Sequence, residues 1–234
     1  MKKTKKTQKM KKVKEMKKTE ISALHGNLLV VSAPSGAGKT TLVHALTKSL
    51  DKITVSISHT TRKKRPAEKD GVNYHFVSTS IFRQMIAEEK FLEHATIFGN
   101  LYGTSGEWVK NTLQQGMDVI LEIDWQGCQH VKALFPGCIS IFIVPPSPHI
   151  LAERLRMRRQ DDHETIEERL RDACETLTHI SEYDYIVLND DFETALSDLQ
   201  AIVAAGRLSQ QYQKNHLSSL LALFEKDVLK KTHP

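Results

Sequence analysis

A glycine-rich turn between an apolar run and a helical pattern constrains this chain more than any other feature of its sequence. Residues 33–40 read Ala-Pro-Ser-Gly-Ala-Gly-Lys-Thr and directly follow the apolar run 28–31. In such a turn backbone N–H groups face one centre and the next helix adds the positive end of its dipole, while the lysine and threonine can reach phosphates and Mg²⁺. The pattern predicts a nucleoside triphosphate site. Its expected residues are Ala33, Pro34, Ser35, Gly36, Ala37, Gly38, Lys39, Thr40 and Thr41, with Thr40 as the magnesium ligand.

This loop departs from the usual pattern at its first position, where Ala33 stands in place of glycine. Alanine fits there if its φ is negative, because only a positive φ strongly disfavours a Cβ. The alternative interpretation is a glycine-rich turn with a chance lysine. The order of strand, turn, Gly-Lys-Thr and a helical apolar stripe favours the phosphate-binding loop. The stripe consists of Leu42, Val43, Leu46 and Leu50.

The positive charge of the chain is concentrated at its start. The formal net charge is +5, but residues 1–18 contain ten Lys and one Glu and carry +9, so the remainder carries −4. This run has no apolar stretch and matches neither a secretory signal nor a membrane span, and we expect residues 1–20 to be a disordered basic tail. It could contact nucleic acid or an anionic surface, be a solvated extension, or precede a true start at Met10 or Met16. Because no aromatic or arginine side chains are interleaved, no specific nucleic-acid partner is expected.

The cysteines and histidines show no metal-binding or redox spacing. Cys128, Cys138 and Cys174 are scattered, and the eleven histidines are dispersed. Cys128 and His130 lie close in sequence, but no second ligand pair accompanies them, so packing or surface roles are favoured over zinc. This pattern fits a reducing compartment, and we expect a cytoplasmic protein with no membrane partner.

Five apolar segments predict the strands of a parallel core sheet, because they alternate with helical patterns and read as nearly continuous apolar runs. They lie at 28–31, 53–57, 119–123, 139–144 and 185–188. At 234 residues the chain is long enough for one α/β core with inserted subdomains. The turn-rich segment 58–104 looks like an insertion, with short strands around 73–77 and a helix marked by Ile81, Met85 and Ile86.

Two further segments have helical patterns. Residues 149–177 are densely charged and predict two helices around a polar turn near Asp161-Asp162. A surface hairpin with solvated salt bridges would explain them, but a closing arginine arm is what a phosphoryl-transfer site beside the loop still needs. The stretch 201–229 has apolar residues at helical spacing and predicts a helix for packing or for contact with a second copy, so a homo-oligomer is possible.

An acceptor site for phosphoryl transfer must carry positive charge beside the triphosphate. The segment 58–66 offers Arg62 and Arg65 three residues apart, where both can bind one phosphate in bidentate fashion. Tyr74 and Tyr102 could donate further hydrogen bonds to the same phosphate.

Over roughly residues 26–207 the chain closely resembles the guanylate kinase family, bacterial type. The resemblance rests on separate stretches and is highly specific. They are the 33–40 loop, Ser58-His-Thr-Thr-Arg62 with Arg65, Asn73-Tyr74, Phe91-Leu-Glu-His-Ala95, Phe98-Gly-Asn-Leu-Tyr-Gly-Thr104, Ile123-Asp-Trp-Gln-Gly127 and Val187-Leu-Asn-Asp-Asp191.

The resemblance implies an α/β P-loop nucleoside monophosphate kinase fold, which divides the chain into a core (21–57, 105–148 and 178–234), a GMP-binding insertion (58–104) and a helical lid (149–177). It also implies site roles. By this resemblance the GMP phosphate is held by Arg62, Arg65, Tyr74 and Tyr102, and guanine is read by Ser58, Glu93 and Thr104. Glu122 and Asp124 lie near magnesium and GMP, and Asn189 and Asp190 lie at the adenine end of ATP. Arg154, Arg158 and Arg169 match lid arginines that close on the transferred phosphoryl group, and with Lys39 and Arg62 they are the expected catalytic residues.

The chemistry of guanine agrees with the role of Glu93, because a carboxylate can accept from N1–H and the N2 amino group together. Glu122 stands where many members have Asp, so its role is the least secure, and Lys64, Ala67, Leu101, Met157 and Arg159 are further departures. The resemblance implies phosphorylation of GMP and dGMP by ATP with Mg²⁺. Two alternatives are a guanylate-kinase-like binding module, which would typically lose the intact Gly-Lys-Thr, and a kinase for another phosphorylated acceptor, which would not need Ser58 with Glu93. A GTPase is disfavoured because the chain lacks an Asn-Lys-x-Asp element.

Overall fold

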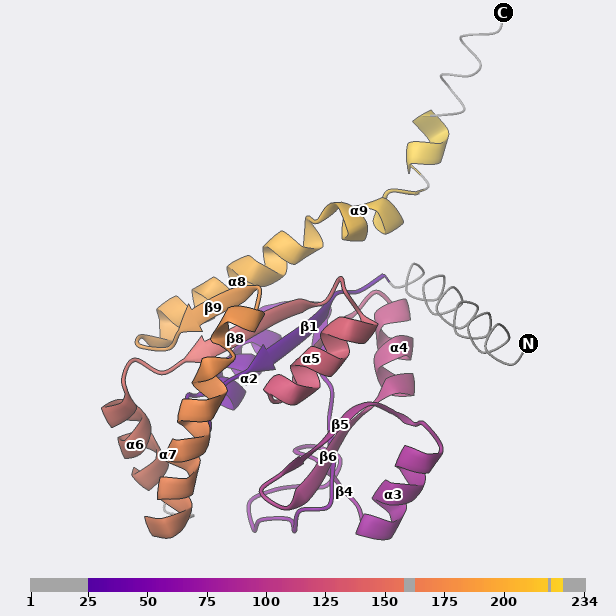
Figure 1. The fold of residues 1–234 in the computed structure, drawn as a ribbon. Helices are drawn as coiled ribbons and strands as arrows, with labels where there is room; N and C mark the ends of the chain where they lie inside the picture. Colours follow the sequence, from indigo (N-terminus) through magenta and orange to yellow (C-terminus); the bar gives the residue numbers. More distant parts are fainter. Residues whose placement is uncertain (1–24, 158–162, 219, 225–234) are drawn as a thin grey trace, which may run out of the picture.

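The core of the molecule is a five-stranded parallel sheet, as predicted (Figure 1). The computed structural model describes residues 25–157, 163–218 and 220–224, so the predicted basic tail and Arg158 lie outside the described residues. The sheet order is β2-β7-β1-β8-β9, and every neighbouring pair is parallel. Its strands are β1 (Leu28–Ser32), β2 (Ile53–Val55), β7 (Asp118–Glu122), β8 (Ile139–Val144) and β9 (Tyr185–Leu188).

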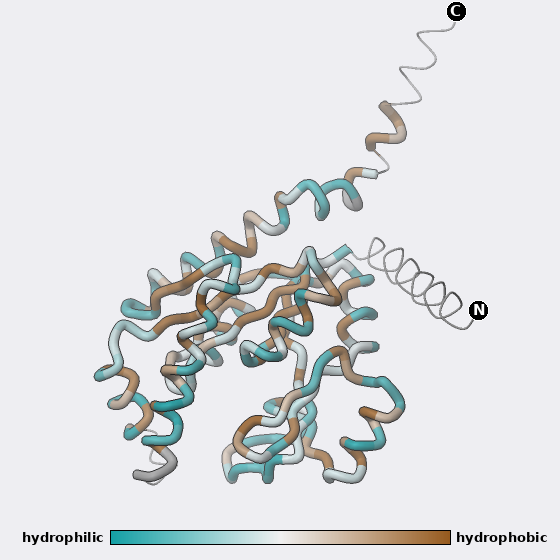
Figure 2. Tube along the Cα trace, in the orientation of Figure 1, coloured by the Kyte–Doolittle hydropathy of each residue, from teal (hydrophilic) through white to brown (hydrophobic). Residues whose placement is uncertain are grey.

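Helices cover both faces of this sheet, which explains why its central strands are apolar at nearly every position. All five residues of β1 are buried, with Leu29 and Val31 on one face and Leu28 and Val30 on the other. The first face packs against α2 (Lys39–Ser49) and α8 (Phe192–Arg207). The second face packs against α4 (Gly106–Gln114) and α5 (Trp125–Leu134). Figure 2 shows the apolar strands between these more polar helices.

The segment 58–104 forms a second sheet of order β4-β3-β6-β5 with the helix α3 (Thr79–Ala87). The strands are β3 (His59–Thr60), β4 (His75–Phe76), β5 (Phe91–Ile97) and β6 (Asn100–Ser105). The helix and the short strand at 75–76 confirm two predictions, whereas the long β5–β6 hairpin was not predicted. Phe98 and Gly99 join its strands with φ of 46° and 72°. Two consecutive positive φ values are typical of a type I′ turn, so Gly99 at the second central position was the available signal.

Two charged helices follow β8, where the sequence predicted them. They are α6 (Pro148–Met157) and α7 (His163–Thr178). They pack on one another through Leu151, Leu155 and Ala173. In Figure 1 the α6–α7 pair and the second sheet extend from the same side of the core sheet. Their role as a lid stays a prediction.

The last described residues leave the core. A short 3₁₀ turn (Ile180–Glu182) leads into β9, and α9 (Gln210–His216) follows α8. Beyond α9 the chain extends away from the sheet (Figure 1), and the side chains of Leu217, Leu220, Leu221 and Phe224 are 41–62% exposed. In the described part of the chain no helix is both long and apolar enough for a membrane span.

Candidate active site

The loop between β1 and α2 has the backbone that its glycines predict. Gly36 and Gly38 have φ of 94° and 93°, in the left-handed region where only glycine is unstrained. Ala33 is not among the residues with positive φ, so the replacement of the usual glycine is accommodated. Lys39 begins α2, and the exposed Thr40 follows it in the first turn. The loop therefore presents its N–H groups and a helix amino terminus at the carboxyl end of the sheet.

Two carboxylates lie next to this loop because β7 is the neighbour of β1. Glu122 ends β7, and its Oε1 is 3.8 Å from Lys39 Nζ. The same oxygen is buried and has no hydrogen-bond partner among the described residues. Asp124 caps α5 by accepting a hydrogen bond from Gly127 N at 2.8 Å. Burial raises the pKa of Asp124, and the charge of Lys39 opposes this shift.

Glu93 and Thr104 form the most buried polar pair in the insertion. They face each other on β5 and β6, and Thr104 Oγ1 donates to Glu93 Oε1 at 2.5 Å. Burial raises the pKa of Glu93 to about 7, while the Thr104 hydrogen bond lowers it and the charge of Asp124 raises it further. A Cβ on Gly127 would lie 3.0 Å from Glu93 Oε2. The first turn of α5 thus approaches Glu93 closely and brings the predicted guanine reader beside Asp124.

Aromatic side chains surround Arg62. Its guanidinium carbon lies 5.4 Å from the centroid of the Tyr74 ring, and the rings of Tyr74 and Tyr102 are 5.9 Å apart. Burial, the nearby Tyr102 and the charge of Glu122 raise the pKa of Tyr74. Ser58 precedes β3, and its carbonyl accepts from His75 N at 2.9 Å. The structure therefore brings the predicted phosphate-binding arginine and tyrosines together, and Tyr74 is close enough to feel the charge of Glu122.

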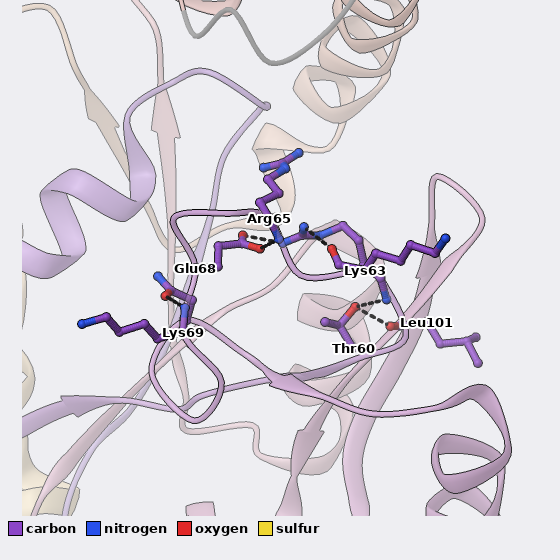
Figure 3. A network of polar contacts seen from close by, with 8 residues as sticks. Thr60, Lys63, Arg65, Glu68, Lys69 and Leu101 are labelled. Atoms are coloured by element: carbon purple, nitrogen blue, oxygen red, sulfur yellow. Dashed lines mark hydrogen bonds and ion pairs between the residues drawn. The ribbon is translucent and has the colours of Figure 1, made fainter.

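Glu68 connects the two predicted phosphate-binding arginines, and the sequence analysis missed it. Its Oε1 accepts from Arg62 Nη2 at 2.6 Å, and its Oε2 accepts from the backbone N–H of Arg65 at 2.8 Å. Figure 3 shows Glu68 beside the backbone of Arg65, with the side chain of Arg65 directed away from the network. Burial disfavours the charged guanidinium, but Glu68 and Tyr102 outweigh it and raise the pKa of Arg62. An acid three residues after Arg65 in a basic segment was the available signal.

The α6–α7 pair also reaches the glycine-rich loop. Arg154 Nη2 donates to the carbonyl of Asn189 at 3.3 Å, while its buried Nη1 has no hydrogen-bond partner among the described residues. Burial and the charges of Glu175 and Asp124 raise the pKa of Asp172 on α7, and the charge of Arg169 opposes them. Arg169 thus lies on α7, the helix on which Asp172 feels the charge of Asp124. Asp190, which follows β9, is exposed.

The parallel sheet, the glycine-rich loop after β1 and the inserted second sheet define a P-loop α/β protein of the nucleoside monophosphate kinase class. The family model described as guanylate kinase matches residues 25–206. A guanylate kinase from Nitrosococcus oceani is 54% identical over 198 residues, which cover 85% of this chain and 98% of the relative. One from Alcanivorax borkumensis is 56% identical over 183 residues, which cover 78% and 88%. The crystal structure of guanylate kinase from Anaplasma phagocytophilum has a TM-score of 0.68 at 30% identity and covers 81% of this chain and 90% of that one. The chain belongs to the guanylate kinase family.

Proposed function

We propose that this protein transfers a phosphoryl group from ATP to GMP, and to dGMP, as an ATP:GMP phosphotransferase. The observation that carries the proposal is the buried pair of Glu93 and Thr104 opposite a phosphate-binding loop that carries Lys39. Membership of the guanylate kinase family supports the same reaction.

Glu93 supplies the base specificity. Its ionised carboxylate can accept from guanine N1–H and the N2 amino group, and the Thr104 hydroxyl holds Oε1 in place. Adenine offers an unprotonated N1 and no N2 amine, so AMP would leave a desolvated carboxylate without partners. Such a mismatch rejects a competitor by about 10⁴-fold or more. Ser58, which precedes β3, is a second candidate for contact with the base.

The acceptor phosphate needs positive charge and no general base. The second pKa of a phosphate monoester is about 6, so the attacking oxygen is largely ionised at neutral pH. Arg62 and Arg65 bind this phosphate, with the hydroxyls of Tyr74 and Tyr102 as further donors. Their arrangement around Glu68 supports this role, because Arg62 is held in place before the substrate binds.

The donor site lies in the loop at 33–41, where backbone N–H groups and Lys39 bind the phosphates of ATP. Magnesium enters with ATP and would be held by the Thr40 hydroxyl, with Glu122 and Asp124 beside it. The donor set fits, because Mg²⁺ prefers oxygen ligands and keeps several waters and phosphate oxygens, and Glu122 Oε1 is a buried acceptor without a hydrogen bond. In the described ranges no three His, Cys, Asp or Glu side chains are grouped so that they could hold a metal ion. When bound, Mg²⁺ neutralises charge that develops on the transferred phosphoryl group.

The arginines of the α6–α7 pair would complete the site on closure. Arg154 already lies beside the loop, with one buried nitrogen that has no hydrogen-bond partner in the described part of the chain, and Arg169 is on α7. Arg158 is predicted to join them. Closure would exclude water and prevent the hydrolysis of ATP. The cytoplasm remains the expected compartment because Cys128, Cys138 and Cys174 are free thiols. Association with a second copy remains a possibility.

A coupled assay with ATP against GMP, dGMP, AMP, CMP and UMP tests the proposal. We expect GMP and dGMP to be phosphorylated, and the kcat/KM for AMP to be lower by about 10⁴-fold. Equal rates with AMP would overturn the guanine assignment. Tight binding of GMP without phosphoryl transfer would favour a binding module.

A further inference from the structure

The side chain of Asn189 is buried inside the protein and holds the backbone of the glycine-rich loop. Its Nδ2 donates to the carbonyl of Ala37 at 2.6 Å, and the residue is 5% exposed. The backbone N–H of Asn189 donates to Val144 O at 2.8 Å, which fixes the residue where β9 leaves the sheet. The amide that was predicted to lie near adenine is therefore already engaged by the protein.

This hydrogen bond fixes the peptide unit between Ala37 and Gly38. In a trans peptide the C=O and N–H groups point in opposite directions. When Asn189 holds the Ala37 carbonyl on one side, the N–H of Gly38 is turned to the other side, away from Asn189. An anion-binding loop requires this orientation, because its carbonyls must point outward and its N–H groups toward the phosphate.

The side chain of Asn189 packs closely against the backbone of the glycine-rich loop. A Cβ placed on Gly38 would lie 2.4 Å from Asn189 Nδ2, so the amide packs directly over the Cα of Gly38. A Cβ placed on Gly36 would in turn lie 3.0–3.1 Å from the side chains of Leu151 and Leu155 on α6. Arg154 from the same helix donates to the carbonyl of Asn189 at 3.3 Å. Asn189 is thus a shared partner of the loop and of a predicted lid arginine.

We propose that Asn189 is a positioning residue of the triphosphate site: its amide orients the Ala37–Gly38 peptide so that the Gly38 N–H faces the phosphate. The inference rests on the proposed function only in that the loop binds a polyphosphate. It assigns the amide to the loop backbone and not to the base of the nucleotide.

Binding of Mg²⁺-tripolyphosphate, which has no base, separates the two roles. Asn189→Asp keeps the size of the side chain but replaces the donor by an oxygen that repels the Ala37 carbonyl. We expect this variant to bind tripolyphosphate at least tenfold more weakly in calorimetry, and its KM for ATP to rise by a similar factor. Its KM for GMP should stay within twofold. Gln200→Glu is the matched control. Gln200 lies on α8, and its Nε2 also donates to an oxygen that is distant in sequence, Ser49 Oγ at 2.9 Å. This control should bind tripolyphosphate within twofold of the parent.

Asn189→Ala, which adds no charge, should show the same loss, and thermal unfolding checks that both variants are folded. In the parent, the Asn189 side-chain amide protons should exchange slowly with solvent, and the Gly38 amide resonance should move when tripolyphosphate is added. Rapid exchange in the parent, or parent-like tripolyphosphate affinity in a folded variant, would overturn the inference. An altered preference between ATP and GTP in that variant would show that the amide reads the base. If the parent failed to phosphorylate GMP while Asn189→Asp still lost tripolyphosphate affinity, the proposed function would fall and this inference would stand.

Discussion

At the scale of single residues, Glu93 is a carboxylate that the fold keeps from water and joins to one hydroxyl. Glu93→Gln replaces one acceptor oxygen by a donor amide of the same size. The change should raise KM for GMP and shrink the GMP-over-AMP ratio of kcat/KM, while KM for ATP stays near the parent value. Steady-state kinetics with both acceptors checks this. Full retention of the GMP preference would show that Glu93 does not read the base.

The raised pKa of Glu93 also predicts a pH dependence. The pKa of Glu93 without a ligand is about 7, above the ordinary 4.5, and on the proposed role GMP would bind the ionised carboxylate. Below pH 7 the site must lose a proton to bind GMP, so KM for GMP should rise by about tenfold from pH 8 to pH 6. The phosphate of GMP titrates with a pKa of about 6 and adds a further part, roughly twofold, to this change. Glu93→Gln should retain only that part; an identical profile in both proteins would contradict the prediction.

At the scale of elements, the basic loop before β4 depends on Glu68. Glu68→Gln weakens the ion pair with Arg62 and perturbs the hydrogen bond to the backbone of Arg65. We expect KM for GMP to rise by about tenfold, which corresponds to about 1.4 kcal/mol, with KM for ATP unchanged. Glu88→Gln is the control in the same insertion, because Glu88 pairs only with exposed neighbours and should leave both constants unaffected. An unchanged KM for GMP in Glu68→Gln would remove Glu68 from the acceptor site.

The α6–α7 pair is the element expected to move. Arg169→Ala should lower kcat much more than it weakens the binding of GMP alone, because a lid arginine engages mainly on closure. The exposed Arg171 on the same helix gives the matched control, and Arg171→Ala should keep kcat within twofold. The measurements are kcat and the Kd for GMP without ATP. A large loss of GMP affinity at unchanged kcat would place Arg169 in the acceptor site instead.

At the scale of the whole molecule, the buried carboxylate of Asp118 ties α8 to the amino ends of the core strands, away from the glycine-rich loop. Asp118 accepts from Asn27 N and from Arg207 Nε, both at 2.7 Å, and Arg207 also donates to the carbonyl of Asp51. Arg207→Ala removes the cation that pairs with the buried Asp118 carboxylate, and of these two hydrogen bonds to it only the one from Asn27 N is left. The free energy of unfolding should therefore fall by about 2–3 kcal/mol. Urea denaturation measures this loss, and kcat/KM of the folded variant should match the parent. A loss below about 0.5 kcal/mol would show that Arg207 is not needed to stabilise Asp118.

The parts of the fold that the sequence predicts are those governed by local pattern. The core strands are continuous apolar runs because both faces of the sheet are covered, and the loop follows from its glycines. The β5–β6 hairpin was not predicted, because its strands are half-exposed and a bulge between Phe91 and Glu93 breaks the alternation of buried and exposed residues. The contact of Asn189 with Ala37 depends on how distant segments meet, so no local spacing indicates it. The partners of Glu68 lie within six residues of it, and an acid in this basic segment was a local signal. Resemblance to a family found Glu93, whereas composition and periodicity alone did not.

The order of strands in the core sheet has a consequence for how the protein is made. β1 leaves the ribosome early, yet its neighbours in the sheet are β7, paired from Leu28 to Val119, and β8, paired from Leu29 to Ile139. At about 5–20 residues per second, the second partner of β1 is synthesised roughly 5–20 s after it. During that time β1 is an apolar strand whose hydrogen-bonding edges are unpaired. We expect the nascent chain to need a chaperone most in this interval. The glycine-rich loop after β1 is thus translated well before it can gain its final shape, because Asn189 must be synthesised before it can hold the carbonyl of Ala37.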